Sequence, residues 1–300
     1  LQEVRLEGDK AVLRFTRKFD KVELKSIEVE KQQLQNALNA LEPDLLGSIR
    51  RAAENIRSFH EKQKENSWFI TAEDGILLGQ KVTPLERVGV YVPGGTAPLP
   101  SSVLMNVIPA KVAGVGEIIL CTPPEKNGLP NAVTLACAAI AGADRVFAVG
   151  GAQAVAAMAY GTETVPKVDK ITGPGNIYVA TAKRMVYGLC GIDMIAGPSE
   201  ILIIADENAR PEYVAADLLS QAEHDTAASS VLLSTSRSLI DQVMTELDKQ
   251  TEKLPRQSFV MESIKNYGAA VLVESLAQAA KISNQIAPEH LELYVKNPLE

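Results

Sequence analysis

Few side chains in this sequence have the chemistry of a catalytic base, because it contains only three histidines, His60, His224 and His290. His60 lies among charged residues in helical sequence, where a surface position is expected. His290 follows Pro288 and Glu289. Because a proline stops the preceding helix and favours an irregular turn, a carboxylate and an imidazole here can face one pocket. Such a pair can supply two bases to a two-step reaction, and an exposed pair at a strand start is the alternative.

Gln221 and His224 form a second candidate pair. They are three residues apart in helical sequence, so both project from one face and can contact one ion or one substrate. A zinc site needs two further ligands. A histidine near a helix C-terminus also interacts favourably with the helix dipole, which is the alternative interpretation of His224.

The three cysteines, Cys121, Cys137 and Cys190, are odd in number and far apart. This spacing argues against a disulfide framework or a thiolate metal site and favours a reducing cytoplasm. A thiol-dependent aldehyde dehydrogenase remains a rival, since it would use a thiolate nucleophile. Cys121 ends an apolar strand and Cys137 lies in a helix of small residues, where burial disfavours the thiolate.

Glycine-rich turns follow apolar strands at four places, residues 93–95, 150–151, 173–176 and 197–199. Ligands of parallel sheets gather at the carboxyl ends of strands, where glycine permits close approach and helix N-termini offer N–H groups to phosphate. The turns therefore indicate a nucleotide or another anionic ligand, unless they serve only as tight connections. No Gly-x-Gly-x-x-Gly follows a strand, so the common dinucleotide fingerprint is absent. A non-catalytic nucleotide- or metabolite-binding protein stays open as an alternative.

The elements that must position these residues are those of a layered α/β protein. The chain has 300 residues, of which 46% are hydrophobic and 5% aromatic, as parallel strands with covering helices require. Its net charge of −7 argues against nucleic acid. No apolar run approaches the roughly 18 residues of a membrane span, so no membrane partner is expected.

The order of elements indicates two α/β units. Residues 1–65 have the spacing of amphipathic helices, and residues 68–92 that of short strands at a sheet edge, with a hairpin turn at Asp74-Gly75. Residues 113–118 align with 141–146 at an offset of 28, which predicts two successive βα units. Further strands are predicted at 169–172 and 192–195. From residue 200 the alternation starts again. Its strands are predicted at 201–204, 231–233, 270–273 and 291–295, and its helices at 214–223, 239–249 and 276–284.

Six motifs resemble histidinol dehydrogenases, in the order of that family. They are Tyr91-Val-Pro-Gly-Gly, Gly150-Gly-Ala-Gln-Ala, Gly173-Pro-Gly-Asn, Ile195-Ala-Gly-Pro-Ser-Glu, Gln221-Ala-Glu-His-Asp and Pro288-Glu-His-Leu. The resemblance covers essentially the whole chain. It implies an α/β fold of two incomplete Rossmann-like domains with mainly parallel sheets and N-terminal helices. The N-terminal helices can pack on the second α/β unit, so we expect residues 1–90 plus 199–300 to form one domain and 91–198 an inserted Rossmann-like domain. The resemblance implies that the first carries the catalytic residues and the second contributes NAD contacts.

The activity implied by the resemblance is the last stage of L-histidine biosynthesis, in the cytoplasm. L-histidinol is oxidised through L-histidinal to L-histidine, with two NAD reduced at a zinc-dependent site. By the same resemblance His290 takes the alcohol proton and Glu289 activates the water that adds to the aldehyde. Gln221 and His224 become zinc ligands that also contact substrate.

The remaining roles also follow from the resemblance alone. Ser199 and His290 contact the substrate, while Tyr91, Gln153 and Asn176 contact NAD. The family forms an intertwined homodimer whose active site is shared between protomers. Its other two zinc ligands, an Asp and a His, and a further substrate-contacting Glu are expected in C-terminal domains beyond Glu300. The 300-residue span is therefore expected to be incomplete for activity.

Overall fold

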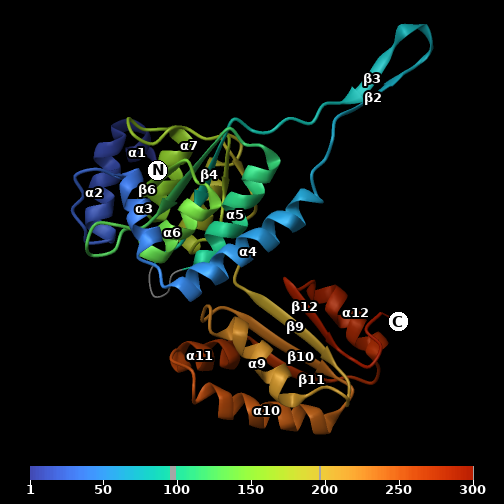
Figure 1. Cartoon of the computed structure of the whole chain (residues 1–300). Helices are drawn as coiled ribbons and strands as arrows, with labels where there is room; N and C mark the ends of the chain where they lie inside the picture. Colours follow the sequence, from blue (N-terminus) through green and yellow to red (C-terminus); the bar gives the residue numbers. More distant parts are fainter. Residues whose placement is uncertain (95–98, 196, 300) are drawn as a thin grey trace. The chain divides into compact units, whose positions relative to one another are not determined.

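The computed structural model describes residues 1–94, 99–195 and 197–299 and divides the chain into two compact units (Figure 1). Unit 1 is Leu1–Ala196 and unit 2 is Gly197–Glu300. Each unit carries its own sheet and its own hydrophobic core. In the part of the chain that is described, no helix is both long and apolar enough to cross a membrane.

The described part of unit 1 holds a six-stranded sheet in the order β1-β6-β5-β4-β7-β8. Neighbouring strands are parallel, except that β1 is antiparallel to β6. The strands are β1 (Glu28–Val29), β4 (Arg87–Tyr91), β5 (Glu117–Thr122), β6 (Arg145–Ala148), β7 (Lys170–Thr172) and β8 (Gly191–Ile192). The predicted repeat is confirmed, because β5 and β6 are parallel neighbours joined by the crossover helix α6 (Ala132–Ala141).

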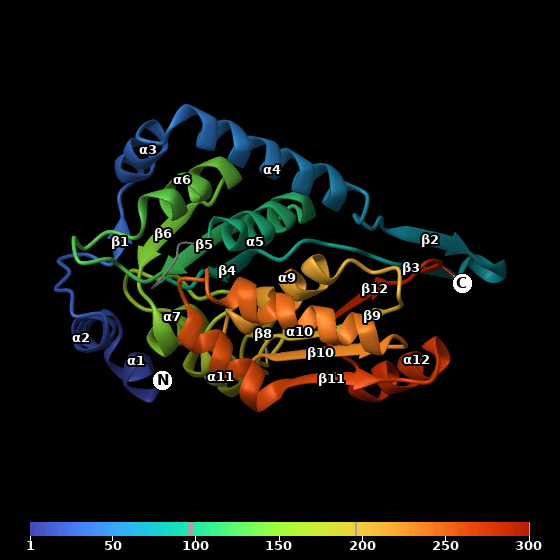
Figure 2. The same ribbon diagram turned by 90° about the horizontal axis from the view of Figure 1, so that it is seen from below.

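Helices cover both faces of this sheet (Figure 2). Alternate residues of β5 separate the two layers: Ile118 and Leu120 lie in one core, and Ile119 and Cys121 in the other. The first core is closed by α3 (Lys31–Asn39), α4 (Pro43–Glu61), α5 (Pro100–Ala113) and α6. The second is closed by α1 (Gln2–Glu7), α2 (Asp9–Phe19), α7 (Gly151–Tyr160) and α8 (Ile177–Val186).

The structure divides the chain differently from the expected 1–90 plus 199–300 and 91–198. The N-terminal segment completes the sheet of unit 1, since β1 pairs with β6 in the register Val29↔Val146. Arg145 Nε and Nη2 each donate to a carboxylate oxygen of Glu28 at 2.7 Å. The amphipathic helices 1–65 therefore bury their apolar faces against residues 91–196, and the unit boundary falls at residue 196.

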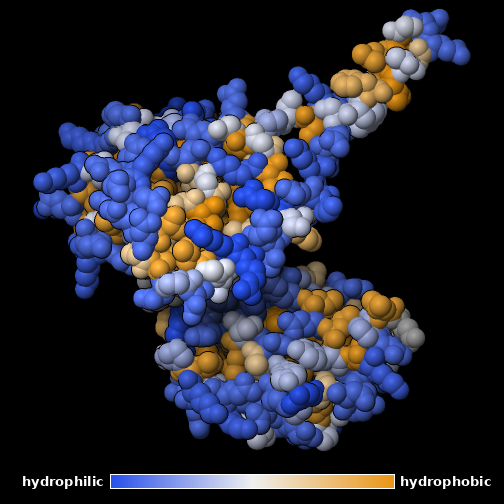
Figure 3. Space-filling model, viewed as in Figure 1, coloured by the Kyte–Doolittle hydropathy of each residue, from blue (hydrophilic) through white to orange (hydrophobic). Residues whose placement is uncertain are grey.

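The predicted hairpin turn at Asp74-Gly75 is confirmed, but the hairpin does not extend a sheet edge. β2 (Trp68–Thr71) and β3 (Leu77–Gln80) pair antiparallel as a separate two-stranded sheet around the short turn η1 (Glu73–Gly75). Every strand residue of this hairpin is exposed. The hairpin projects from the body of unit 1, and its apolar side chains form a hydrophobic surface (Figures 1 and 3).

Within residues 197–299 four parallel strands form the sheet of unit 2, in the order β11-β10-β9-β12. They are β9 (Glu200–Ala205), β10 (Ser229–Ser234), β11 (Gly268–Leu272) and β12 (His290–Tyr294). One core joins the sheet to α9 (Pro211–Ala222), α10 (Arg237–Thr251) and α11 (Gln257–Tyr267), and a smaller one joins it to α12 (Leu276–Ile286). The predicted strands and helices of this unit are confirmed. The additional helix α11 was not predicted. Of its apolar residues only Val260 is fully buried, so its sequence lacks a clear apolar stripe.

Candidate active site

Three turns meet at the carboxyl edge of the unit 1 sheet, after β4, β6 and β7. Tyr91 ends β4, and its hydroxyl accepts a hydrogen bond from the Gly151 backbone N–H at 3.0 Å. Gly173, after β7, has φ +109°, and a Cβ there would lie 2.0 Å from the Tyr91 carbonyl oxygen. Only glycine fits this position. The turns therefore contact one another, as the carboxyl-edge argument predicts.

Two helices begin at this edge, α7 at Gly151 and α8 after its N-cap Asn176. The Asn176 Oδ1 accepts from the backbone N–H groups of Tyr178 at 3.1 Å and Val179 at 3.2 Å. Its amide NH₂ stays available for a ligand. Because α7 and α8 pack together, their N-termini bring two positive dipole ends to one region of this edge.

The three residues expected to contact NAD lie at this edge. Gln153 is buried in the first turn of α7, and a Cβ at Gly151 would lie 2.8 Å from its Oε1. Burial raises the pKa of Tyr91 to about 12, so its hydroxyl stays protonated and can donate as well as accept. Gly95, in the motif that begins at Tyr91, lies outside the described residues.

In unit 2 the predicted catalytic residues lie at the opposite kind of edge, the amino ends of the strands. Ser199 precedes β9, and its carbonyl accepts from the Ser229 N–H at the start of β10 at 2.9 Å. His290 begins β12 and is the register partner of Ile201. Glu289 Oε2 accepts from the Glu200 N–H at 3.4 Å. Ser199, Glu289 and His290 therefore share one edge. Within unit 2, the turn 197–199 lies at an amino edge because β9 begins immediately after it.

The side chains of Glu289 and His290 lie close to each other and are exposed to solvent. Glu289 Oε1 lies 3.9 Å from His290 Nε2, and the two side chains are 54% and 49% exposed. As predicted, the proline stops the helix: α12 ends at Ile286, Ala287 has φ +53°, and Pro288 follows. Because Glu289 precedes the regular strand, strand alternation does not force its side chain away from His290.

Helix α9 brings Gln221 to the same edge. It connects the parallel strands β9 and β10, so it runs against them and ends beside their amino ends. His290 and Tyr294 lie on the face of β12 that is covered by α9, since the Tyr294 hydroxyl donates to Asp217 of α9. Gln221 is one helical turn beyond Asp217, toward the amino edge. Gln221 and His290 therefore belong to one side of the sheet.

The helix ends earlier than expected, and His224 lies beyond it. α9 ends at Ala222 rather than about Glu223, and the His224 N–H donates to the Gln221 carbonyl at 3.0 Å. This bond continues the helical turn and keeps His224 next to Gln221. The His224 side chain is exposed and Gln221 is half-buried.

A further carboxyl group, not predicted from the sequence, lies beside this site. Glu292 is two residues after His290 and shares its strand face. Burial, with the neighbouring Asp217 carboxylate, raises the pKa of Glu292, so the two carboxyl groups resist carrying two charges. Strand alternation from His290 is the signal that could have found it.

Comparison with known proteins decides the family. The family model of histidinol dehydrogenase matches residues 1–300. The chain belongs to the histidinol dehydrogenase family. It is 54% identical over 300 residues to the histidinol dehydrogenase of Clostridium acetobutylicum and 52% identical over 299 residues to that of Halalkalibacterium halodurans. In both comparisons essentially the whole chain aligns with 70% of the relative.

Solved structures agree with this family and its fold. The histidinol dehydrogenase of Elizabethkingia anophelis superposes with a TM-score of 0.94 at 42% identity, covering 99% of this chain and 68% of that one. A propionaldehyde dehydrogenase of Rhodopseudomonas palustris, with bound CoA and an acylated cysteine, reaches a TM-score of 0.50 at 12% identity. It covers 98% of this chain and 83% of that one, and this likeness concerns the fold alone.

A zinc site needs more ligands than the amino edge of the unit 2 sheet provides. Gln221 and His224 are two donors, whereas structural and catalytic zinc ions take at least three protein ligands. Within residues 1–94, 99–195 and 197–299 no cluster of three or more His, Cys, Asp or Glu side chains is placed to hold a metal. The donors described here therefore do not form a complete zinc site.

The cysteines lack the properties of a catalytic thiol. All three are buried. Burial raises the pKa of Cys121 to about 12 and those of Cys137 and Cys190 to about 11. Thiols with such pKa values are protonated at neutral pH and are poor nucleophiles. The structure thus gives no support to a thiol-dependent aldehyde dehydrogenase.

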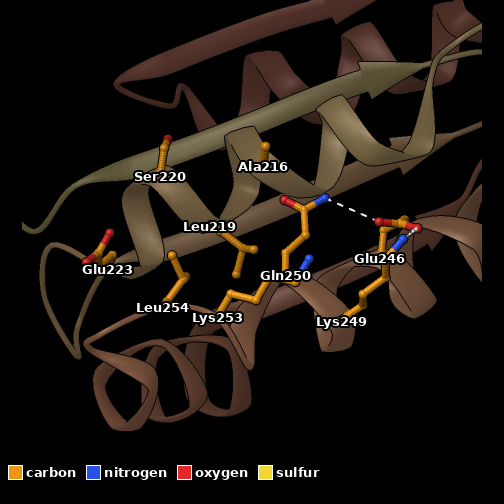
Figure 4. A pocket seen from close by; sticks show the side chains of 9 residues that line it. All are labelled: Ala216, Leu219, Ser220, Glu223, Glu246, Lys249, Gln250, Lys253 and Leu254. Carbon is orange, nitrogen blue, oxygen red and sulfur yellow. Dashed lines mark hydrogen bonds and ion pairs between the residues drawn. The ribbon is translucent and has the colours of Figure 1, made fainter.

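A hollow of about 510 Å³ between α9 and α10 is separate from these residues (Figure 4). Glu246 accepts from Lys249 at 2.8 Å and from Gln250 at 3.5 Å across its wall. The hollow is lined by none of the predicted site residues, although Ser220 and Glu223 border it.

Proposed function

We propose that this family member oxidises L-histidinol through L-histidinal to L-histidine, the last steps of L-histidine biosynthesis. The observation that carries the proposal is the open Glu289–His290 pair, which shares an edge with Ser199 and a side of the sheet with Gln221. Two bases beside each other suit two successive oxidations of one substrate.

NAD is the proposed oxidant, and the carboxyl edge of unit 1 fits it. Tyr91, Gln153 and Asn176 lie beside the N-termini of α7 and α8, whose positive dipole ends favour a pyrophosphate. When bound, NAD accepts one hydride in each oxidation. The residues themselves bind and orient the dinucleotide.

The two bases act in turn on the substrate. In the first oxidation His290 takes the hydroxyl proton of L-histidinol. The hydride leaves the carbon that bears this hydroxyl and passes to NAD, which forms the aldehyde. In the second, Glu289 takes a proton from the water that adds to the aldehyde carbon. The resulting hydrate anion gives its hydride to a second NAD and becomes the carboxylic acid. Both side chains are half-exposed, so substrate and water can reach them.

For zinc, we propose that Gln221 and His224 supply two ligands and, with Ser199 and His290, contact the substrate. Their oxygen and imidazole nitrogen are suitable donors. We expect the remaining ligands from outside the described residues. Orientation of the substrate is the contribution expected of this edge.

We also propose a cytoplasmic homodimer with an active site shared between protomers. Three cysteines without disulfides support the reducing compartment. The exposed apolar hairpin β2–β3 supports assembly with a second copy, because monomers rarely expose such surfaces.

The test is NADH formation from L-histidinol by the full-length protein, with and without a chelator. Two NADH for each histidinol are expected, with loss of turnover in chelator and recovery on addition of Zn²⁺. Turnover that survives complete removal of zinc would contradict the zinc proposal. NAD binding without any turnover of histidinol would favour a non-catalytic binding protein.

A further inference from the structure

One lysine of unit 1, Lys183, is buried. A charged ammonium in a buried position needs hydrogen-bonding or charged partners. The Lys183 side chain, in the last turn of α8, is 3% exposed. Its ammonium donates to the Gly173 carbonyl at 3.0 Å and pairs with the Asp193 carboxylate. Burying an ammonium is costly, so its partners must be held in place whenever the unit is folded.

Asp193 completes the arrangement from the segment after β8. Its Oδ2 accepts from the Gly173 N–H at 2.8 Å, and its Oδ1 accepts from the Met194 N–H at 2.7 Å. The N–H and the carbonyl of Gly173 are therefore both bound by this one ion pair.

Gly173, the residue bound by this ion pair, begins the turn that leads to Asn176. On its other side Gly173 packs against the Tyr91 carbonyl, where no Cβ fits. The turn is thus confined between β4 and the Lys183–Asp193 pair. Lys183 can reach it because side chains of a helix lean toward its N-terminus, and Lys183 lies two turns into α8.

We propose that Lys183 and Asp193 are positioning residues for the dinucleotide site, fixing the turn 173–176 so that Asn176 and the N-terminus of α8 face NAD. This inference rests on the proposed function, which places NAD at that turn. Neither side chain needs to touch the dinucleotide, since the ion pair acts through the backbone of Gly173.

The same unit contains a second, more exposed lysine–aspartate pair at the other edge of its sheet. Lys111 Nζ lies 2.8 Å from Asp144 Oδ2, which also accepts from the Ile118 N–H at 2.8 Å. This pair likewise joins a helix lysine to an aspartate that binds a backbone N–H. It lies at the amino ends of β5 and β6, away from the turns. Removing the charges of Lys111 and Asp144 therefore shows how the loss of an ion pair distant from the turns affects stability and NAD binding.

The experiment measures the NAD dissociation constant by titration calorimetry on the full-length protein, with kcat, KM for histidinol and unfolding by urea. The double variant Lys183→Met/Asp193→Asn leaves no unpaired buried charge. It is expected to raise the NAD dissociation constant about tenfold or more, with KM for histidinol changed less than about threefold. The double variant Lys111→Met/Asp144→Asn is expected to lose stability but keep its NAD affinity.

Single substitutions of Asp193 are expected to weaken NAD binding to different degrees. Asp193→Asn retains an oxygen that can accept from the Gly173 N–H, so it should weaken NAD binding less than Asp193→Ala. If the Lys183→Met/Asp193→Asn variant binds NAD as tightly as the Lys111→Met/Asp144→Asn control, the positioning role is refuted. Equal dissociation constants for Asp193→Asn and Asp193→Ala, both at the wild-type value, would refute it too.

Asn176→Ala separates this inference from the proposed function. If Asn176→Ala weakens NAD binding and the Lys183 and Asp193 variants do not, only the positioning role fails. If Asn176→Ala binds NAD normally while those variants bind it weakly, the Asn176 contact fails, and the turn acts through its backbone.

Discussion

At the scale of single residues, the position of His290 explains why two neighbouring side chains can share a substrate. The strand begins at His290, and Glu289 still belongs to the turn made by Pro288. The Glu289–His290 distance of 3.9 Å permits separate roles, because neither side chain is locked in a short bond to the other.

Replacing His290 by Asn should remove the proposed base of the first oxidation. We expect kcat for histidinol to fall by about 10²- to 10⁴-fold, with little change in NAD affinity, because His290 is not among the proposed NAD contacts. Steady-state kinetics and calorimetry on the full-length protein measure both. His60→Asn makes the same change on α4 and should leave kcat unaltered. Wild-type turnover by His290→Asn would disprove the role of this imidazole.

Cysteine substitution distinguishes the proposed chemistry from a thiol mechanism. Cys190→Ala should keep kcat within about twofold of the wild type, because burial raises the pKa of this thiol to about 11 and leaves no thiolate to attack. The same assay with Cys121→Ala and Cys137→Ala completes the set. A variant that folds, binds NAD and yet has no turnover would restore the thiol hypothesis.

At the scale of elements, the short strand β1 decides which unit the N-terminal helices join. It has two residues, yet Glu28 carries a bidentate ion pair to Arg145 at the start of β6. This pair lowers the pKa of Glu28, first through the hydrogen bond from Arg145. A lowered carboxyl pKa stabilises the folded state above the unfolded value, and that contribution disappears as pH falls through the folded pKa.

Glu28→Gln should therefore destabilise unit 1 at neutral pH and have little effect in acid. We expect a loss of about 1 kcal/mol at pH 7, a modest value because both side chains are partly exposed. Below the lowered pKa of Glu28 the variant and the wild type should unfold at the same urea concentration. Glu23→Gln, in the far more exposed Arg17–Glu23 pair, is the control with little expected effect. An equal loss at pH 7 and in acid would contradict this linkage.

At the scale of the whole molecule, apolar surface stands out on the hairpin β2–β3. Trp68, Phe69, Ile70, Leu77 and Leu78 are each more than half exposed. Isolated two-stranded sheets are marginally stable in water, so a projecting apolar hairpin gains stability from a partner surface. This agrees with the proposed homodimer.

The cross-strand pair Ile70↔Leu78 provides a test of assembly. Ile70→Ser/Leu78→Ser should raise the dimer dissociation constant by about tenfold or more, because it removes apolar area from the interface. Light scattering after size-exclusion chromatography over a range of protein concentrations measures it. Glu73→Ser, in the turn of the same hairpin, should leave the dimer intact. An unchanged dissociation constant for the double variant would exclude the hairpin from the interface.

The sequence by itself determined the local elements and the family. Periodicity over a few residues located the strands and helices of unit 2, and the glycine turns of unit 1 fell where β4, β6 and β7 end. These features depend on side-chain spacing and backbone freedom within one segment. Six motifs in order, including Gly173-Pro-Gly-Asn and Gln221-Ala-Glu-His-Asp, were enough for the family.

Only the tertiary structure decided how distant segments combine. Pairing of Val29 with Val146 brings the N-terminal helices into unit 1, and the Lys183–Asp193 pair closes on Gly173. Glu292 joins the site through Asp217 of α9. Such contacts depend on which surfaces remain to be buried once the sheets have formed, and no spacing within a single segment encodes that outcome.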